Sequence, residues 1–206
     1  MVFTTRSFNM AHLNPLNAAD IEDADLQSML KRYLDIRKFI PNSVLTMARR
    51  PSIAKAFAQL NQAILYEGTV PEETKMLVAL ISSQASGCRY CQSHMANLSS
   101  IYKASDEKIA HLWEFETHSL FSDSERAALR VAMKAGQLPN ACNDEDFDAL
   151  KAHWDEGQIV EIVASIGLFG YLNRWNDTMA TELEEYPAGV AERTLGDWGW
   201  NRGKHL

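Results

Sequence analysis

The residues best able to do chemistry lie together in the run Cys88-Arg-Tyr-Cys91-Gln-Ser-His94. Two cysteines three positions apart on a helix share one face, so they can close a disulfide with little movement of the backbone. His94 follows Cys91 by three more positions, where an imidazole can take the proton of a thiol. We therefore predict a dithiol site made of Cys88, Cys91 and His94. Cys91 is expected to be the more acidic thiol, because His94 can stabilise its thiolate.

Two other interpretations of the cysteine pair remain open from the residues alone. A structural zinc site needs four ligands, whereas Cys88, Cys91 and His94 supply three and the chain has no second C-x-x-C or His pair. Cysteines are also common as small buried hydrophobic residues without reactivity. We expect no metal and no cofactor. Cys142 precedes an acidic helix start, where carboxylates disfavour a thiolate, so we expect it to be a spectator.

The composition is that of a folded, acidic protein. Of the 206 residues, 46% are hydrophobic and 23% are charged, which excludes bulk disorder. The formal net charge of −7 and the lack of a basic stretch argue against nucleic-acid binding. We find no signal peptide and no run of the roughly 18 apolar residues that a membrane span needs, and expect a soluble, cytoplasmic protein. Thiols stay mostly reduced there, which favours a catalytic or metal-binding pair over a structural disulfide.

Helices must position this site. Apolar residues recur at helical spacing over most of the chain, and no useful length alternates with period two, so the expected fold is all-α. The apolar run from Met76 to Ile81 predicts a deeply buried helix over 71–86, which Ser86-Gly87 interrupts just before Cys88. A helix that begins near Cys88 brings its first N–H groups close to the thiols and lowers a thiol pKa. Further helices are expected over 20–39, 51–67, 108–115, 127–135, from 143 onward and over 158–183.

A faint internal repeat appears when the chain is shifted by 85 residues, which lays Cys88-Arg-Tyr-Cys91 on Asn173-Arg-Trp-Asn176. Either a helical hairpin has been duplicated and only the first copy keeps its thiols, or two apolar helices match by chance. We expect one domain over 1–206, with an irregular arm over 1–19 and a tail over 186–206. Trp198 and Trp200 of the tail are expected to pack on the body or on a second subunit.

The block from Lys75 to Ala96, with Gly87-Cys-Arg-Tyr-Cys-Gln-Ser-His94 inside it, resembles the carboxymuconolactone decarboxylase family in its AhpD-like alkylhydroperoxidase branch. The resemblance covers about residues 25–185. It continues through Phe121-Ser-Asp-Ser-Glu-Arg-Ala-Ala-Leu-Arg130, Gln158-Ile-Val-Glu-Ile-Val-Ala164 and Leu172-Asn-Arg-Trp-Asn-Asp177.

This resemblance implies an AhpD-like all-α fold, a homo-oligomer and the reduction of hydroperoxides by the cysteine pair. It implies that Cys91 attacks the peroxide, that Cys88 resolves the sulfenic acid into a disulfide, and that a thiol or dithiol reductant, such as a partner protein, restores the pair. In the family pattern the histidine lies four residues after the second cysteine, where this chain has Met95. His94 lies three residues after it and can approach Cys91 from the other flank.

A second departure concerns the proton-relay glutamate of the family, whose position is taken by Met76. Met76 cannot relay a proton. Glu72 and Glu73 lie one turn earlier, and Glu161 takes the equivalent place in the second copy of the repeat. The sequence leaves open which of these carboxylates serves, or whether any does.

The leading functional prediction is a thiol-dependent peroxidase or dithiol–disulfide oxidoreductase in antioxidant defence. One alternative is lactone decarboxylation, a branch of the family that does not depend on a C-x-x-C pair. The other is a non-catalytic oligomeric scaffold whose cysteines only pack. Titration of the thiols distinguishes the enzyme from the scaffold, because only an enzyme of this kind interconverts a dithiol and a disulfide.

Overall fold

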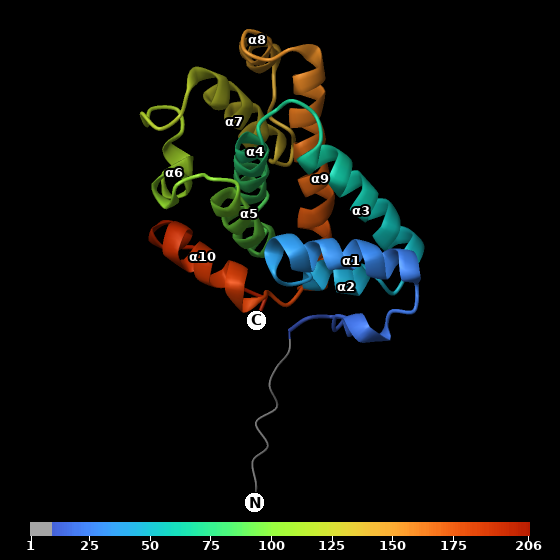
Figure 1. Cartoon of the computed structure of the whole chain (residues 1–206). Coiled ribbons are helices and arrows are strands. Elements are labelled where there is room, and N and C mark those ends of the chain that lie inside the picture. Colours follow the sequence, from blue (N-terminus) through green and yellow to red (C-terminus); the bar gives the residue numbers. More distant parts are fainter. Residues whose placement is uncertain (1–9) are drawn as a thin grey trace, which may run out of the picture.

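The computed structural model describes residues 10–206, and all the regular elements in this part of the chain are helices (Figure 1). The all-α prediction is thereby confirmed. The helices are α1 (Ala24–Arg37), α2 (Asn42–Met47), α3 (Pro51–Tyr66), α4 (Glu72–Ala85), α5 (Arg89–Ile101), α6 (Asp106–Ala110), α7 (Asp123–Ala135), α8 (Asp144–Lys151), α9 (Glu156–Met179) and α10 (Glu185–Leu195), with short 3-10 turns at Ala18–Asp20, Leu112–Glu114 and Gly196–Trp198.

Helix α4 is the centre of the fold, as its apolar run predicts. It packs against α3, α5, α7 and α9, and its residues from Thr74 to Ser83 are all buried. A helix that is apolar on every side can be stable only when other helices surround it. Helix α5, which carries the cysteines, packs on α4, α9 and α10, so the site lies at the meeting point of these helices (Figure 1).

The helix ends follow the local signals of the sequence. Pro51 occupies the first turn of α3, where its missing N–H costs no hydrogen bond. Ser122 and Glu125 form a capping box at the start of α7, in which each side chain accepts a hydrogen bond from the other residue's backbone N–H. Asn143 caps α8 in the same way with Asp146.

A buried ion pair fastens α9 to the loop that leads into α4. Lys75 is 1% exposed, and its Nζ lies 2.8 Å from Oε2 of Glu161. The same ammonium donates hydrogen bonds to the carbonyl oxygens of Ile64 and Glu67. The Glu161 carboxylate also accepts hydrogen bonds from the backbone N–H groups of residues 69 and 70. Residue 68 must be glycine here, because it has a φ of +92° and a Cβ would lie 2.3 Å from the Glu161 carboxyl carbon.

Removal of one charge from this pair is expected to destabilise the fold. Glu161→Gln leaves the Lys75 ammonium buried without a counter-charge, which should cost about 3 kcal/mol in the free energy of unfolding, measured with urea. The double variant Lys75→Met/Glu161→Gln removes both charges and should lose clearly less. If the single and double variants lose the same stability, the electrostatic origin of the effect is wrong.

The C-terminal segment over 186–206 is largely helical, since α10 and a 3-10 turn occupy most of it. Both of its tryptophans contact the body, as expected. Trp200 is buried and its Nε1–H donates to the carbonyl of Arg89, and Trp198, 46% exposed, donates from Nε1–H to the carbonyl of Ala110.

The structure corrects one expectation: the second copy of the repeat is no hairpin, because α9 continues unbroken through Asn173, the residue that aligns with Cys88. Residues 10–17 contain no helix, and the rest of the expected N-terminal arm, 1–9, lies outside the described residues.

None of the helices in residues 10–206 combines the length and apolar character needed to span a bilayer.

Candidate active site

A sharp turn between α4 and α5 places the cysteines. Gly87 has a φ of +77°, the left-handed region that glycine enters without steric cost. The N–H of Gly87 donates to the carbonyl of Gln84, and the N–H of Cys88 donates to that of Ser83, the paired hydrogen bonds of a Schellman C-cap. Cys88 is therefore the residue that caps α5, and Cys91 lies in the first turn. The predicted helix start at the thiols is confirmed.

The two thiols differ in acidity, and the order is opposite to the one predicted. The hydrogen bond that Cys88 accepts from Cys91 is the main cause that lowers the pKa of Cys88, which stands at about 6 although burial opposes ionisation. Burial, together with the charge held on Cys88, raises the pKa of Cys91 well above its usual range. The directions of the two shifts favour a pair that shares a single proton, with the negative charge on Cys88.

A residue that the sequence did not single out, His205, stabilises this charge. His205 is 1% exposed, and its hydrogen bond and charge both lower the pKa of Cys88. Its Nδ1 lies 2.8 Å from the carbonyl oxygen of Thr181, which accepts a hydrogen bond from it, and its Nε2 lies 4.0 Å from Oδ1 of Asp177. No motif signal marks His205, because it lies more than a hundred positions after Cys88 in the sequence.

Cys91 has a different partner. The side-chain Nδ2 of Asn176 lies 3.4 Å from the Cys91 sulfur and donates to it, which favours the thiolate form of Cys91. Asn176 also donates to the carbonyl oxygen of Leu172, so the amide is fixed in this orientation. The sequence repeat pairs the same two residues, Cys91 and Asn176, and the structure brings them into contact where α5 packs on α9.

His94 is bound to a carboxylate rather than to a thiol. Its Nε2 lies 2.7 Å from Oε2 of Glu184, the residue that precedes α10. Glu184 also accepts hydrogen bonds from the hydroxyl of Tyr90 and from the backbone N–H of Asn42, and the Tyr90 ring stacks on His94 at 4.3 Å between centroids.

Burial works against ionisation of Glu184, but the charge and hydrogen bond of His94 hold the pKa of this carboxyl below its usual value. An ionised carboxylate only accepts hydrogen bonds, so the Nε2–H of His94 donates and its Nδ1 is left for other chemistry. Glu184 is thus the carboxylate of the site. Its position, 90 residues after His94, gave no signal in the sequence.

The three carboxylates that the sequence offered as relay candidates have other partners. Glu161 pairs with Lys75, and Glu73 pairs with Lys108. Glu72 lies exposed at the start of α4. Met76 is fully buried in the core. The carboxylate that contacts the site histidine comes instead from the segment before α10.

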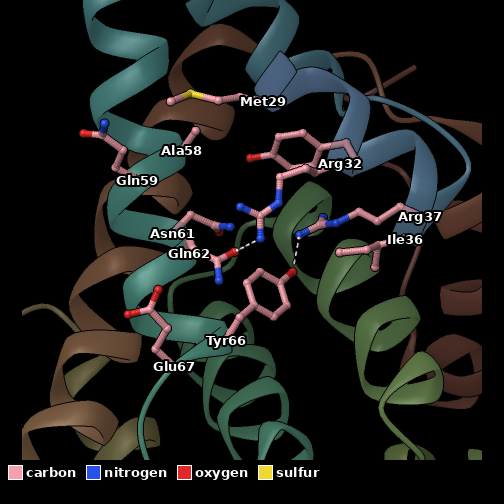
Figure 2. A pocket seen from close by; sticks show the side chains of 11 residues that line it. Met29, Arg32, Ile36, Arg37, Ala58, Gln59, Asn61, Gln62, Tyr66 and Glu67 are labelled. Carbon is pink, nitrogen blue, oxygen red and sulfur yellow. Dashed lines mark hydrogen bonds between the residues drawn. The ribbon is translucent and has the colours of Figure 1, made fainter. Parts of the chain in front are cut away.

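A small inner cavity borders Cys91 and His94. It measures about 30 Å³, room for one or two small atoms, and Tyr90, Phe169 and Asn176 also line it. An outer groove of about 290 Å³ runs between α1 and α3 (Figure 2). Its lining residues include Met29, Arg32 and Ile36 of α1 and Ala58, Gln62 and Tyr66 of α3. Tyr33, Arg37 and Asn61 line both spaces, so the outer groove and the inner cavity adjoin at these three residues.

The charge on the cysteine pair can be measured directly. Thiolate absorbance in the ultraviolet should rise with a midpoint near pH 6 in the wild type, because the first proton leaves Cys88 at a pKa of about 6. His205→Asn removes a group that favours the thiolate, so the midpoint should move up by about one pH unit. The exposed His153→Asn should leave it unchanged. A wild-type midpoint above pH 8, or no shift in His205→Asn, contradicts this assignment.

Comparison with known proteins gives matches over both sequence and fold. Residues 51–134, which contain Cys88, Cys91 and His94, match the model of the carboxymuconolactone decarboxylase family. The debrominase Bmp8 is 31% identical in sequence to this chain. Its crystal structure matches with a TM-score of 0.82, over 93% of this chain and 100% of Bmp8. A Cys-to-Ala variant of Bmp8 in complex with 2,3,4-tribromopyrrole is 32% identical, again with a TM-score of 0.82, over 88% of this chain and 96% of that one.

Two further matches concern the fold in one case and part of the sequence in the other. An AhpD-core, peroxidase-related protein from Ralstonia eutropha shares the fold at a TM-score of 0.76 and 22% identity, over 86% of this chain and 94% of that one. The uncharacterised protein YnjA of Escherichia coli is 30% identical over 105 residues, a match that spans 51% of this chain and 58% of YnjA. With a family model that spans the cysteine turn and a close structural relative along its whole length, this chain belongs to the carboxymuconolactone decarboxylase family and has the AhpD-like fold.

Proposed function

We propose that the protein is a dithiol-dependent reductase in which Cys88 and Cys91 give two electrons to a substrate and end as a disulfide. The observation that carries the proposal is the unequal pair itself. One thiol has a pKa of about 6, and its partner borders an inner cavity that adjoins the outer groove. Two inert packing cysteines would need neither a shared negative charge nor His205 and Asn176 as polar partners.

The first substrate class is a hydroperoxide. Cys91 passes its proton to the Cys88 thiolate, and the Cys91 sulfur attacks the peroxide, so that the O–O bond breaks and an alkoxide leaves with a proton from His94. Cys91 is then a sulfenic acid. Cys88 attacks the sulfenic sulfur and closes the disulfide, its proton leaves with the released hydroxide as water, and His94 regains a proton from solvent. In sum, one hydroperoxide and two thiols give an alcohol, water and a disulfide.

His94 and Glu184 supply the proton chemistry in this scheme. The Glu184 carboxylate holds the ring by Nε2–H, which leaves Nδ1 to give and regain a proton at the cavity. A carboxylate behind an imidazole also stabilises the positive charge that the ring carries while it is doubly protonated. His94 thus acts on the leaving group, a role different from the thiol activation predicted from spacing.

The second substrate class is a halogenated aromatic ring. It is favoured by the 31% identity to a debrominase over 93% of the chain and by the aromatic and apolar lining of the inner cavity. An inner space of about 30 Å³ accepts a reacting substituent but no ring, so the ring would remain in the outer groove. In this reaction a carbon–bromine bond is replaced by a carbon–hydrogen bond, bromide and a proton are released, and the two thiols become a disulfide.

One assay separates the two substrate classes. The reduced protein is supplied with dithiothreitol and either cumene hydroperoxide or 2,3,4-tribromopyrrole, and peroxide loss and bromide release are followed, with Cys91→Ser as the control. Turnover of either substrate that depends on Cys91 supports the reductase and identifies the class. If neither substrate is consumed and the thiols do not interconvert with a disulfide, the proposed reductase function is wrong. The decarboxylase and the non-catalytic scaffold are then the favoured alternatives.

The reductase needs a thiol or dithiol reductant, from a protein or a small molecule, to reopen the disulfide.

We also propose a homo-oligomer. Large apolar side chains lie exposed on two helices that pack together, Ile53 and Leu60 on α3 and Val160, Val163 and Tyr171 on α9. Such a surface is typical of a subunit interface. Light scattering should give a multiple of the 23.2 kDa chain mass, and a mass of one chain at micromolar concentration contradicts the proposal.

A further inference from the structure

A buried arginine stands at the junction of the outer groove and the inner cavity. Arg37, the last residue of α1, is 6% exposed and lines both spaces. Its guanidinium donates one hydrogen bond, 3.3 Å long, to the hydroxyl of Tyr66 (Figure 2). The same guanidinium lies over the Tyr33 ring at 5.4 Å from the centroid. A guanidinium carries five N–H donors, and the structure engages one of those of Arg37 with a protein acceptor.

No carboxylate neutralises this cation within the described residues. Among residues 10–206, Arg37 makes no ion pair within 4.0 Å, although Glu67 lines the same groove. The first nine residues, which lie outside the described part, contain neither Asp nor Glu. Tyr33 is neutral, because burial raises its pKa to about 12. A buried charge without a counter-charge is costly and is normally paired in a folded protein.

The cost of this unpaired charge is explained if a ligand supplies the counter-charge. We propose that Arg37 binds an anionic group of the substrate, a carboxylate or an acidic phenolate, so that the body of the molecule lies in the outer groove with its reacting end toward Cys91. A planar guanidinium can bind a carboxylate through two parallel hydrogen bonds, and one face of this guanidinium is already occupied by Tyr33. The groove of about 290 Å³ is of the size that a single aromatic ring fills.

Arg32 provides a matched control in the same groove. It also belongs to α1 and lines the groove, but it is exposed, and its guanidinium donates to Oε1 of Gln62 at 2.6 Å (Figure 2). An exposed cation keeps its hydration and gains little from an added anion, whereas a dehydrated one gains much more. The two arginines therefore differ in burial but not in charge.

The test measures binding of benzoate and of benzamide, a neutral compound of the same shape, to the reduced wild-type protein by calorimetry. Neither probe has a peroxide or a halogen, so neither reacts with the cysteines. Benzoate is expected to bind at least about tenfold more tightly than benzamide to the wild type, a preference that Arg37→Gln should abolish and Arg32→Gln should retain. Arg37→Lys, which keeps the charge but loses the planar fork, should retain part of it.

Thermal stability provides a second readout. If Arg37 is unpaired, Arg37→Gln should have a Tm equal to or above that of the wild type, and benzoate should raise the Tm of the wild type and of Arg32→Gln but not that of Arg37→Gln. Equal binding of both probes to the wild type overturns the inference. A benzoate preference that survives in Arg37→Gln overturns it as well. A changed subunit number in Arg37→Gln, without any benzoate preference in the wild type, would mean that a second copy of the chain neutralises this arginine.

The inference rests on the proposed reductase only in treating the bound anion as a substrate. A protein without dithiol turnover that still binds benzoate through Arg37 would refute the function and leave the anion site standing. A protein that reduces neutral substrates and shows no benzoate preference would support the reductase and refute the anion site.

Discussion

Cys91→Ser should lower turnover at least about 1,000-fold, because a hydroxyl at the position that borders the inner cavity cannot donate electrons to the substrate. Cys88→Ser should behave differently. It keeps the attacking sulfur, so a first attack still takes place, but it lacks the second sulfur that closes the disulfide. Cys91 should then accumulate as sulfinic acid when excess hydroperoxide is added, which mass spectrometry detects as two added oxygens.

Cys142→Ser is the control for both variants. Cys142 is partly buried, burial raises its thiol pKa, and its sulfur donates to the carbonyl oxygen of Val131 away from the cavity. This variant should retain wild-type turnover. Full activity of Cys91→Ser, or rapid over-oxidation in the wild type while Cys88 is present, would contradict the assigned roles.

Glu184→Gln should lower turnover by about 100-fold with little change in fold, a loss typical when a general acid or base is no longer aligned. The carboxylate accepts from Asn42, Tyr90 and His94 at once, whereas an amide has one accepting oxygen. If that oxygen stays with Asn42 and Tyr90, the amide NH₂ faces Nε2 of His94. The ring must then carry its proton on Nδ1, the tautomer that cannot accept a proton at the cavity.

Glu184 also makes the free energy of unfolding depend on pH. The folded-state pKa of Glu184 is lowered, so its contribution to the free energy of unfolding is present at neutral pH and is lost as the pH falls through that pKa. Glu184→Gln should therefore be less stable than the wild type near neutrality, and the two should converge in acid. Glu185→Gln, at an exposed residue paired with Arg202, is the matched control and should keep its turnover. Unchanged turnover in Glu184→Gln would show that the proposed proton transfer by His94 is wrong.

The sequence predicted the parts of the fold that depend on local signals. The buried helix α4, the turn at Gly87 and the start of α5 at the thiols all follow from residues within one or two helical turns. The cysteine pair was found for the same reason, since Cys88 and Cys91 are three positions apart.

The rest of the site depends on contacts between distant segments. Glu184 and His205 reach the site because the chain after α9 packs on α5, and Arg37 reaches it from the other side as the end of α1. The spacing of His94 and Cys91 suggested a thiol base, but spacing cannot show that a stronger partner lies 90 residues later. The order of the thiol pKa values was wrong because it assumed that His94 faces Cys91.

The burial of both sulfurs also limits how the protein can be restored after a turnover. Cys88 is 1% exposed and Cys91 is 2% exposed, so an incoming thiolate has no straight approach along a bond between them. If the proposed disulfide forms, its lifetime should depend on how readily a reductant reaches it, through the groove or when the surrounding helices open. Slender thiols that can enter the groove would shorten that lifetime, and bulky ones would not. In the proposed reductase, the burial that protects the reduced cysteines from chance oxidation would also slow the reduction of the disulfide after a turnover.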